Sequence, residues 1–321
     1  MRALVVRLSA IGDCVMSVPV AVSIRQAAPD AEIWWAVEPR CEAVLDTSSL
    51  VNRKVYFDRQ GWKRRRAKLS VWREQVLTYA CLRRAHFDLG IELQGHFKTA
   101  LALRIASPKK RIAAVARDEG AKRLNPVAES ARRHIHVVER NLGALAELGP
   151  FNTQPHWIMP SVEKEATLVR SRILKNKPLA TISVGAGHTK KILPGEKWGQ
   201  TASEMLKRGF QVAFLGGADE SAPPIEGTID FVGKLSLAET MAAVTLSRIH
   251  IAADTGTGHL AAAYGIPVVS VFGATDPVLF RPYTNRCKVV EQNCKPAEVP
   301  VSAIVEACEA LLEECGEPVS H

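Results

Sequence analysis

The sequence lacks the features of a membrane-spanning or exported protein. No apolar run reaches the ~18 to 20 residues that a helix needs to cross a bilayer. The N-terminus runs directly into a strand-like segment, so we expect no signal peptide, which would show a separate apolar core and cleavage site. The seven cysteines form no CxxC pair and are odd in number. They therefore predict reduced cytosolic thiols rather than a disulfide framework or a zinc site.

The signatures of several nucleotide- and nucleic-acid-binding classes are also missing. There is no helix-turn-helix, zinc-finger or aromatic RNA-platform pattern, which argues against nucleic acid as a partner. No GxGxxG follows the first expected strand, and this argues against a nicotinamide dehydrogenase. The Walker A pattern is absent as well. The composition itself, 47% hydrophobic and 23% charged, is that of an ordinary soluble globular protein.

The charge of the chain is concentrated in its first half. Residues 1–160 hold 26 Lys and Arg against 15 Asp and Glu, whereas the rest of the chain holds 16 against 18. The densest basic run is WKRRRAK, residues 62–68. A basic face suits a polyanion or an anionic membrane surface. The alternative for such a run is a solvated helix start or loop.

The pattern of apolar and polar residues predicts an α/β fold in two domains, because 321 residues are long for a single core. In the first half we expect strands over 2–7, 31–37, 54–57, 88–93 and 111–115, and helices over 19–26, 67–84, 98–106 and 135–148. A segment rich in proline, residues 149–160, is the expected linker. In the second half we expect strands over 179–185, 210–217, 229–233, 248–254 and 266–273, and helices over 163–174, 196–208, 237–246, 258–264 and 301–315.

This alternation predicts two doubly wound parallel sheets, in domains 1–160 and 161–321, with a cleft between them. Ligands of such folds bind beyond the carboxyl ends of the strands, at helix N-termini. Asp13 follows Gly12 just after the first expected strand, in the stretch VRLSAIGDCVMSVP. It has two interpretations, a helix cap or a catalytic base.

The segment IAADTGTGHLAAAYGIPVVSVFGATDP, residues 251–277, is the sharpest candidate for a ligand site. A buried strand is expected to end at Asp254, and the small residues from Thr255 on lead into an Ala-rich helix. Exposed N–H groups and the helix dipole at such a turn favour a phosphate. His259 could donate to a phosphate oxygen. The alternative is a helix capped by Asp254 or Thr255, with His259 as a structural contact.

These motifs resemble those of glycosyltransferase family 9, the ADP-heptose:lipopolysaccharide heptosyltransferases. The resemblance rests on DTGxxHLxAA followed by PVVxxFGxTDP, on SAIGD at residues 9–13, on FDLGIELQGHFKTAL at 87–101 and on HIHVVERNL at 134–142. Four separated motifs in the family's order cover almost the whole chain. GWKRRRAK and HVVER most resemble the family's heptosyltransferase I members, which add the first heptose to the inner core.

The resemblance implies a GT-B fold with two Rossmann-like domains. It implies an inverting, metal-independent transfer of heptose from ADP-heptose to the phosphorylated Kdo–lipid A acceptor in lipopolysaccharide biosynthesis. The N-terminal domain would bind the acceptor and the C-terminal domain the ADP-sugar, which agrees with the basic first half. We further expect a monomer on the cytoplasmic face of the inner membrane, attached peripherally through anionic lipid.

The resemblance also implies roles for individual residues. Asp13 would be the base that deprotonates the acceptor hydroxyl, kept ionised by a helix N-terminus and nearby cations. The donor's diphosphate would be met by Lys191 and by Asp254, Thr255, Gly256 and His259. The family shows Lys-x-Trp-Pro where this chain has Lys191-Ile192-Leu193-Pro194, so Lys190 competes with Lys191 for the phosphate. The residues that the resemblance and the basic run suggest for the acceptor are Gly12, Arg64, Arg65, Arg66 and Lys98.

The chain contains no Asp-x-Asp motif, which metal-dependent sugar transferases commonly use to hold the metal. We therefore expect no metal and no cofactor. Two alternatives to the heptosyltransferase hypothesis are a family 9 relative with another nucleotide sugar or glycan acceptor, and a nucleotide-sugar-binding protein without activity. Asp13 discriminates against the second, because a binding protein needs no carboxylate on the acceptor side.

Overall fold

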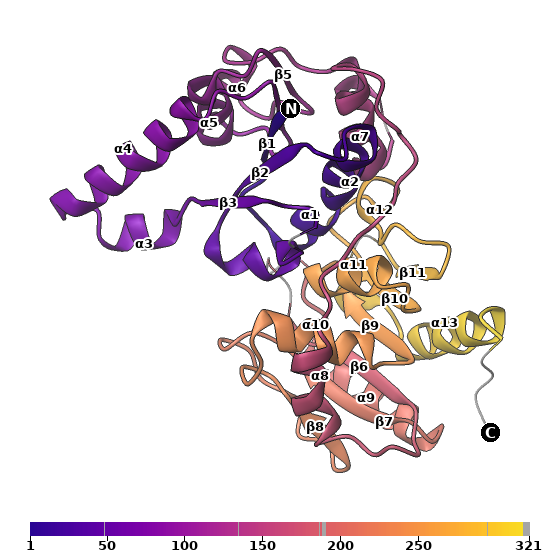
Figure 1. Cartoon of the computed structure of the whole chain (residues 1–321). Helices are drawn as coiled ribbons and strands as arrows, with labels where there is room; N and C mark the ends of the chain where they lie inside the picture. The colour runs from indigo at the N-terminus through magenta and orange to yellow at the C-terminus, as the bar shows by residue number, and fades with distance from the viewer. Residues whose placement is uncertain (48, 134, 186, 188–190, 294, 317–321) are drawn as a thin grey trace. The chain divides into compact units, whose positions relative to one another are not determined.

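The computed structural model describes all residues except 48, 134, 186, 188–190, 294 and 317–321. The chain divides into two compact units, Met1–Pro160 and Ser161–His321, coloured from indigo to magenta and from pink to yellow in Figure 1. Each unit is an α/β structure with its own sheet, and each is described by itself.

The sheet of unit 1 has five parallel strands in the order β3-β2-β1-β4-β5. The strands are β1 Arg2–Val6, β2 Glu32–Val37, β3 Arg53–Tyr56, β4 Leu89–Glu92 and β5 Lys110–Ala113. β1 lies at the centre, and its residues Ala3 to Val6 are fully buried. Apolar runs of this kind form parallel strands because helices cover both faces of such sheets.

The longer helices of unit 1 flank this sheet. Figure 1 shows α2 and α7 on one side of it and α4 and α5 on the other. The helices and 3-10 segments are α1 Ile11–Val15, α2 Val18–Ala27, η1 Pro39–Leu45, α3 Arg59–Arg64, α4 Leu69–Arg84, α5 Phe97–Ala106, α6 Glu119–Lys122, η2 Glu129–Arg132 and α7 Val137–Ala146. The core below α4 and α5 includes Trp34, Phe57 and Phe87.

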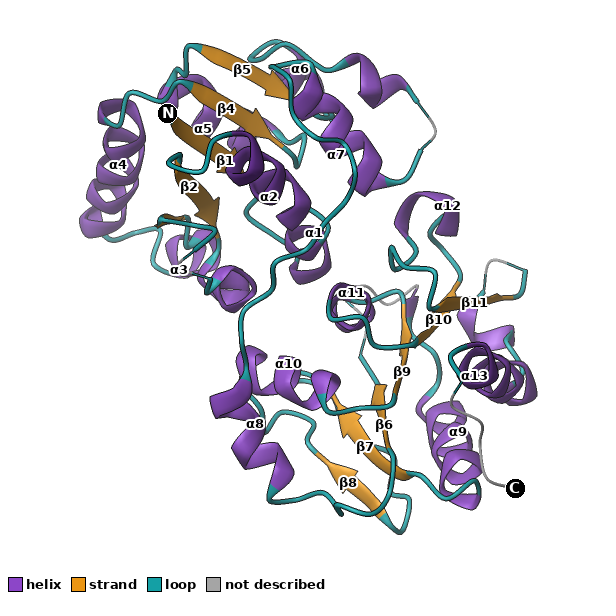
Figure 2. Ribbon diagram, turned by 45° about the vertical axis from the view of Figure 1, so that its right-hand side comes forward, coloured by secondary structure: helices purple, strands orange, loops and turns teal. Residues whose placement is uncertain are grey.

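The sheet of unit 2 has six parallel strands in the order β11-β10-β9-β6-β7-β8. They are β6 Leu179–Ser183, β7 Gln211–Leu215, β8 Thr228–Asp230, β9 Ile249–Ala253, β10 Val268–Phe272 and β11 Cys287–Glu291. The helices are α8 Glu163–Arg170, α9 Gly195–Lys207, α10 Leu237–Thr245, α11 Gly256–Ala263, α12 Pro277–Phe280, η4 Pro296–Glu298 and α13 Val301–Glu314. Figure 2 shows α9 and α13 on one side of the sheet and α8 and α10 on the other.

The predicted α/β class with parallel sheets is confirmed, and every expected strand overlaps an observed one. Among the described elements, the strand β11, the helices α1, α3, α6 and α12, and the three 3-10 segments were not expected. The unexpected helices have at most six residues, and β11 is a half-buried edge strand that reads CKVVE, too short an apolar run to stand out. Among the described residues, no helix is long and apolar enough to cross a membrane.

Candidate active site

Asp13 is both a helix cap and a charged group presented to solvent. It is the third residue of α1, and its Oδ2 accepts a hydrogen bond from the backbone N–H of Ala10 at 3.2 Å. Its Oδ1 forms an ion pair with Nη2 of Arg7. The Asp13 side chain is 28% exposed. Both contacts orient the carboxylate, and the side chain remains partly exposed.

Arg7 is the residue that holds Asp13 in place. It directly follows β1 and its side chain is 2% exposed. Nη1 donates to the carbonyl of Leu93, which follows the neighbouring strand β4, while Nη2 faces Asp13. A guanidinium buried this deeply needs an anionic partner, because the cost of removing its charge from water is otherwise not offset. Arg7 thus ties Asp13 to the carboxyl edge of two adjacent strands.

Glu92, the last residue of β4, is a second carboxyl at this edge and, unlike Asp13, it is buried. Its Oε1 accepts the backbone N–H groups of Gln94 at 2.7 Å and Gly95 at 2.8 Å. Burial raises the pKa of Glu92, while these N–H groups, Thr99 and the charge of Arg7 act in the opposite direction. Gly95 has φ +82°, a conformation that the tight loop requires and that glycine adopts readily. Glu92 therefore shapes the loop beside Arg7.

Glu92 was not among the predicted site residues. The sequence does indicate it, because it is a carboxylate at the end of an otherwise apolar strand. The side-chain amide of Gln94 adds a further link, since its Oε1 accepts the N–H of Leu8 at 3.1 Å. The loop after β4 is thus fastened to the loop after β1, which carries Asp13.

A cavity of about 690 Å³ lies in unit 1 beside these loops. Two of the predicted acceptor residues, Arg66 and Lys98, line it, and so does Leu8. The lining also includes three further cations and several aromatic rings, namely Arg40, Arg59, Lys63, Phe57, Trp62, Trp72, Tyr79 and Phe97. One carboxylate, Glu38, lines it too and forms ion pairs with Arg40 and Arg59, which leaves Lys63, Arg66 and Lys98 as the cations not paired with it. A cavity with this lining suits an anionic ligand that also has apolar or ring surface.

The other predicted acceptor residues lie elsewhere in unit 1. Gly12 is buried within α1. Arg64 is exposed at the end of α3. The guanidinium of Arg65 makes two hydrogen bonds to Glu74, at 2.9 and 3.1 Å, and lies 3.7 Å from Asp58. Within the described part of the chain, none of these three residues lines the cavity.

Asp254 is the centre of the candidate site in unit 2. It directly follows β9 and is buried. Its Oδ2 accepts from Nζ of Lys191 at 2.5 Å and from Oγ1 of Thr275 at 2.5 Å, and its Oδ1 lies 3.9 Å from Nε2 of His259. Thr275, the threonine of the PVVxxFGxTDP motif, follows β10, the next strand in the sheet, and no role was predicted for it. The site thus draws on three loops at one edge of the sheet.

Helix α11 begins at this site with Gly256. Thr255 is its N-cap residue, and the Thr255 hydroxyl lies 2.9 Å from that of Thr257, which in turn donates to Ser183 at 2.8 Å. The positive end of the α11 dipole and its first N–H groups favour an anion. The structure therefore groups Lys191, Asp254, Thr255, Gly256 and His259 around one helix start, whereas Lys190 lies outside the described residues.

Comparison with known proteins identifies the family to which these two sites belong. Residues 79–303 match the family model of glycosyltransferase family 9 (heptosyltransferase), which is more than half of the chain. The chain belongs to glycosyltransferase family 9. It is therefore a glycosyltransferase. The match includes Lys191 and Asp254 and begins after Asp13, so the assignment of Asp13 rests on the SAIGD resemblance and on its own geometry.

Curated relatives agree with the family. Lipopolysaccharide heptosyltransferase 1 of Pseudomonas aeruginosa is 27% identical over 297 residues, which cover 86% of this chain and 80% of the relative. Lipopolysaccharide heptosyltransferase 3 of Escherichia coli K12 is 26% identical over 298 residues, covering 85% and 83%. The family and these relatives support heptosyl transfer in lipopolysaccharide core biosynthesis. They divide between types 1 and 3, so the resemblance to heptosyltransferase I holds only loosely at the level of the subtype.

Solved structures of this family share the fold. A family 9 glycosyl transferase from Veillonella parvula superposes with a TM-score of 0.81 at 19% identity, covering 98% of this chain and 97% of that one. E. coli heptosyltransferase WaaC with ADP has a TM-score of 0.81 at 21% identity, covering 97% and 100%. The predicted GT-B fold is confirmed.

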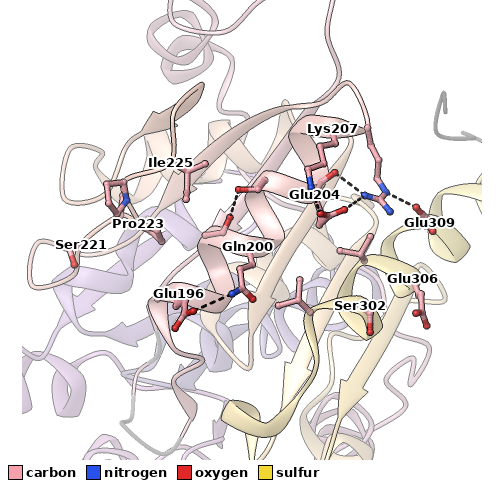
Figure 3. A pocket seen from close by; sticks show the side chains of 18 residues that line it. Glu196, Gln200, Glu204, Lys207, Ser221, Pro223, Ile225, Ser302, Glu306 and Glu309 are labelled. Atoms are coloured by element: carbon pink, nitrogen blue, oxygen red, sulfur yellow. Dashed lines mark hydrogen bonds and ion pairs between the residues drawn. The ribbon is translucent and has the colours of Figure 1, made fainter.

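The glycosyltransferase has a second cavity that belongs to neither site. It measures about 910 Å³ and lies in unit 2 between α9, residues 221–225 and α13. Figure 3 shows Glu196 and Gln200 along one helix and Glu306 and Glu309 along the other, with the ion pairs of Glu204 at one end. Within the described part of the chain, no residue of the two candidate sites lines it.

Proposed function

We propose that this glycosyltransferase transfers heptose from ADP-heptose to the Kdo–lipid A inner core, with inversion at the anomeric carbon and without a metal ion. The observation that carries the proposal is the geometry of Asp13, a solvent-accessible carboxylate oriented by a buried arginine. A cap alone would not need a guanidinium beneath it.

In the proposed reaction Asp13 acts as the general base. The acceptor hydroxyl attacks the anomeric carbon, its proton passes to Asp13, and the bond from that carbon to the ADP oxygen breaks. Attack from the face opposite ADP gives inversion. Arg7 serves as a positioning residue, because it contacts Asp13 and is itself buried.

The departing ADP gains negative charge on its β-phosphate. In this proposal the charge is met by Nζ of Lys191 and by the N–H groups at the start of α11. Lys191 is 27% exposed, so it can turn from Asp254 toward a phosphate oxygen. A cation and a helix N-terminus supply the stabilisation that a metal ion provides in other transferases, and no metal or cofactor is required.

The acceptor would bind in the 690 Å³ cavity of unit 1, where Arg66 and Lys98 can pair with its anionic groups. A second candidate is another lipopolysaccharide core acceptor, because a relative named heptosyltransferase 3 is about as similar as one named heptosyltransferase 1. Assays with Kdo–lipid A and with later core intermediates decide between them. We also propose that the protein works as a monomer, attached peripherally to the inner face of the inner membrane.

Replacement of Asp13 by Asn tests the base. We expect ADP release to fall by about 10²- to 10⁴-fold while ADP still binds with unchanged affinity. Asp30→Asn, the same change in an exposed turn, is the matched control and should retain full activity. Because Arg7 loses its anionic partner, thermal unfolding of both variants must be recorded. Turnover by folded Asp13→Asn at the wild-type rate would refute the assignment.

Chelation tests the metal-free mechanism. Transfer should continue at the wild-type rate in EDTA, measured as ADP release from ADP-heptose. Loss of activity that Mg²⁺ restores would contradict the proposal, and it would leave the assignment of Asp13 unaffected.

A further inference from the structure

Helix α4 presents a row of large apolar side chains to solvent. Leu69, Trp72, Val76 and Leu77 are between 55% and 84% exposed. Leu69, Trp72 and Val76 follow the spacing of three and four residues that places side chains on one face of a helix, and Leu77 adjoins them. Figure 1 shows α4 with α3 at the edge of unit 1. Single exposed apolar residues are ordinary, but a contiguous row marks an interaction surface.

The opposite face of α4 already packs on unit 1. Val71 and Leu82 are buried, and Tyr79 meets Phe57 edge to face with ring centroids 5.5 Å apart. The exposed row is therefore additional to the residues that fix the helix in the fold. Its apolar character is not needed to hold α4 in place.

The surroundings of this row are strongly basic. Residues 59–84 contain nine Lys and Arg and a single acidic residue, Glu74. Glu74 is engaged by Arg65, at 2.9 and 3.1 Å. Seven of the other cations are exposed, namely Lys63, Arg64, Arg66, Lys68, Arg73, Arg83 and Arg84. The surface thus combines apolar side chains, one of them an indole, with a rim of positive charge.

We propose that this face of α4, Leu69, Trp72, Val76 and Leu77 with its basic rim, docks on an anionic lipid bilayer. Apolar side chains that enter the headgroup boundary, with cations that pair with anionic lipid, are the features of interfacial helices. The charge selects this occupant over a second copy of the chain, since the same basic rim on two copies would repel.

The face is continuous with the proposed acceptor site. Trp72 and Arg66 also line the 690 Å³ cavity. A bilayer against α4 would therefore present its headgroup layer at the mouth of that cavity. This step rests on the proposed function, in which the acceptor is a lipid, whereas the docking itself can be measured without any acceptor.

The test uses the full chain and two triple variants. Leu69→Gln, Val76→Gln and Leu77→Gln remove the apolar row at residues that do not line the cavity and that are exposed, so the fold should persist. Leu168→Gln, Leu174→Gln and Val278→Gln remove two leucines and a valine that are exposed in unit 2, and serve as the matched control. Binding is measured by co-sedimentation with vesicles of phosphatidylcholine and phosphatidylglycerol in equal parts, and of phosphatidylcholine alone.

We expect the wild-type protein and the control variant to bind the mixed vesicles, and this binding should weaken at high salt. Both proteins should bind vesicles of phosphatidylcholine alone far less. The α4 triple variant should partition on the order of 100-fold more weakly, because interfacial binding scales with buried apolar area. The emission of Trp72, taken as wild type minus Trp72→Phe, should shift to shorter wavelength on mixed vesicles. Equal binding by wild type and the α4 variant, or equal binding to both lipids, overturns the proposal.

Two further measurements separate the possible failures. With an acceptor fragment that lacks acyl chains, the α4 variant should transfer heptose with the wild-type kcat/KM. If the wild-type protein transfers no heptose but still binds the mixed vesicles, the proposed function fails and the docking surface stands. Sedimentation velocity provides the last outcome. If the wild-type protein is a dimer and the α4 triple variant is a monomer, the exposed row contacts a second copy of the chain, and the lipid assignment is overturned.

Discussion

Replacement of Lys191 by Met separates phosphate binding from the support of Asp254. Nζ of Lys191 lies 2.5 Å from Oδ2 of Asp254, and the lysine side chain is 27% exposed. A charge-assisted contact of this kind contributes about 1.5 to 3 kcal/mol, which corresponds to roughly 10- to 150-fold in a dissociation constant. We expect the Kd for ADP, measured by titration calorimetry, to rise by that factor.

Comparison with adenosine monophosphate identifies the phosphate. If Lys191 meets the β-phosphate, Lys191→Met should weaken ADP binding and leave the weaker binding of the monophosphate nearly unchanged. If Lys191 only holds Asp254, both nucleotides should lose affinity together, and the phosphate role would be refuted. Lys190→Met is the matched variant, since it removes the adjacent cation, and it should have little effect.

Stability provides the control for this experiment. Without Lys191, Asp254 retains its 2.5 Å hydrogen bond from Thr275. Breaking a fully buried pair costs about 3 to 5 kcal/mol, and the partial exposure of Lys191 reduces that cost. Calorimetry must therefore be carried out below the melting transition of the variant. Thr275→Val removes the other hydrogen-bond donor to Asp254, and its effect on stability and on the Kd for ADP shows how much the support of Asp254 alone contributes.

Three other predictions concern charge and pH. Arg66→Ala and Lys98→Ala should each raise the KM for the acceptor about 10-fold, most at low salt. Arg65→Ala should leave this KM unchanged, because Arg65 is already paired with Glu74. An equal rise in KM for all three variants would contradict the assignment of the acceptor to the cavity. Replacing all three arginines of residues 64–66 together should raise KM no further than Arg66→Ala does. Burial lowers the pKa of His250 in the folded protein to about 3. As pH falls, His250 therefore takes up a proton in the unfolded chain before it does so in the folded protein, and the free energy of unfolding decreases from about pH 6.5 toward pH 3. Between about pH 7 and pH 4 the free energy of unfolding should decrease by about 3 kcal/mol, as measured by urea unfolding. His250→Leu should remove this difference between the two pH values. If the difference persists in the variant, another group causes it.

Much of the site could be read from residue order. Asp254 directly follows an apolar strand and precedes a helix start, and Asp13 lies in the first turn of the helix after β1. The carboxyl edge of a parallel sheet is where such residues meet ligands. Helix α11 begins two residues earlier than expected, which makes Thr255 its cap. Local pattern was sufficient here because strand, turn and cap are neighbours in the chain.

Partners distant in the chain could not be read in this way. Arg7 meets the carbonyl of Leu93, and Thr275 meets Asp254 from the loop after another strand. Arg65 belongs to a basic run in the sequence, yet in the fold its charge is engaged by Glu74, nine residues away on α4. Which cations line a cavity therefore depended on how α3 and α4 pack, which periodicity does not specify.

The order of residues by itself determined the alternating α/β pattern, the uneven charge, and the places of Asp13 and Asp254 between a strand and the body of the next helix, because each depends on neighbours along the chain. The tertiary structure decided that Asp13 rests on a buried Arg7, that Glu92 shapes the adjacent loop, and which apolar face of α4 remains exposed. Helical spacing places Trp72 and Val71 on different faces of α4, but only packing against Phe57 and its neighbours shows which face the core covers.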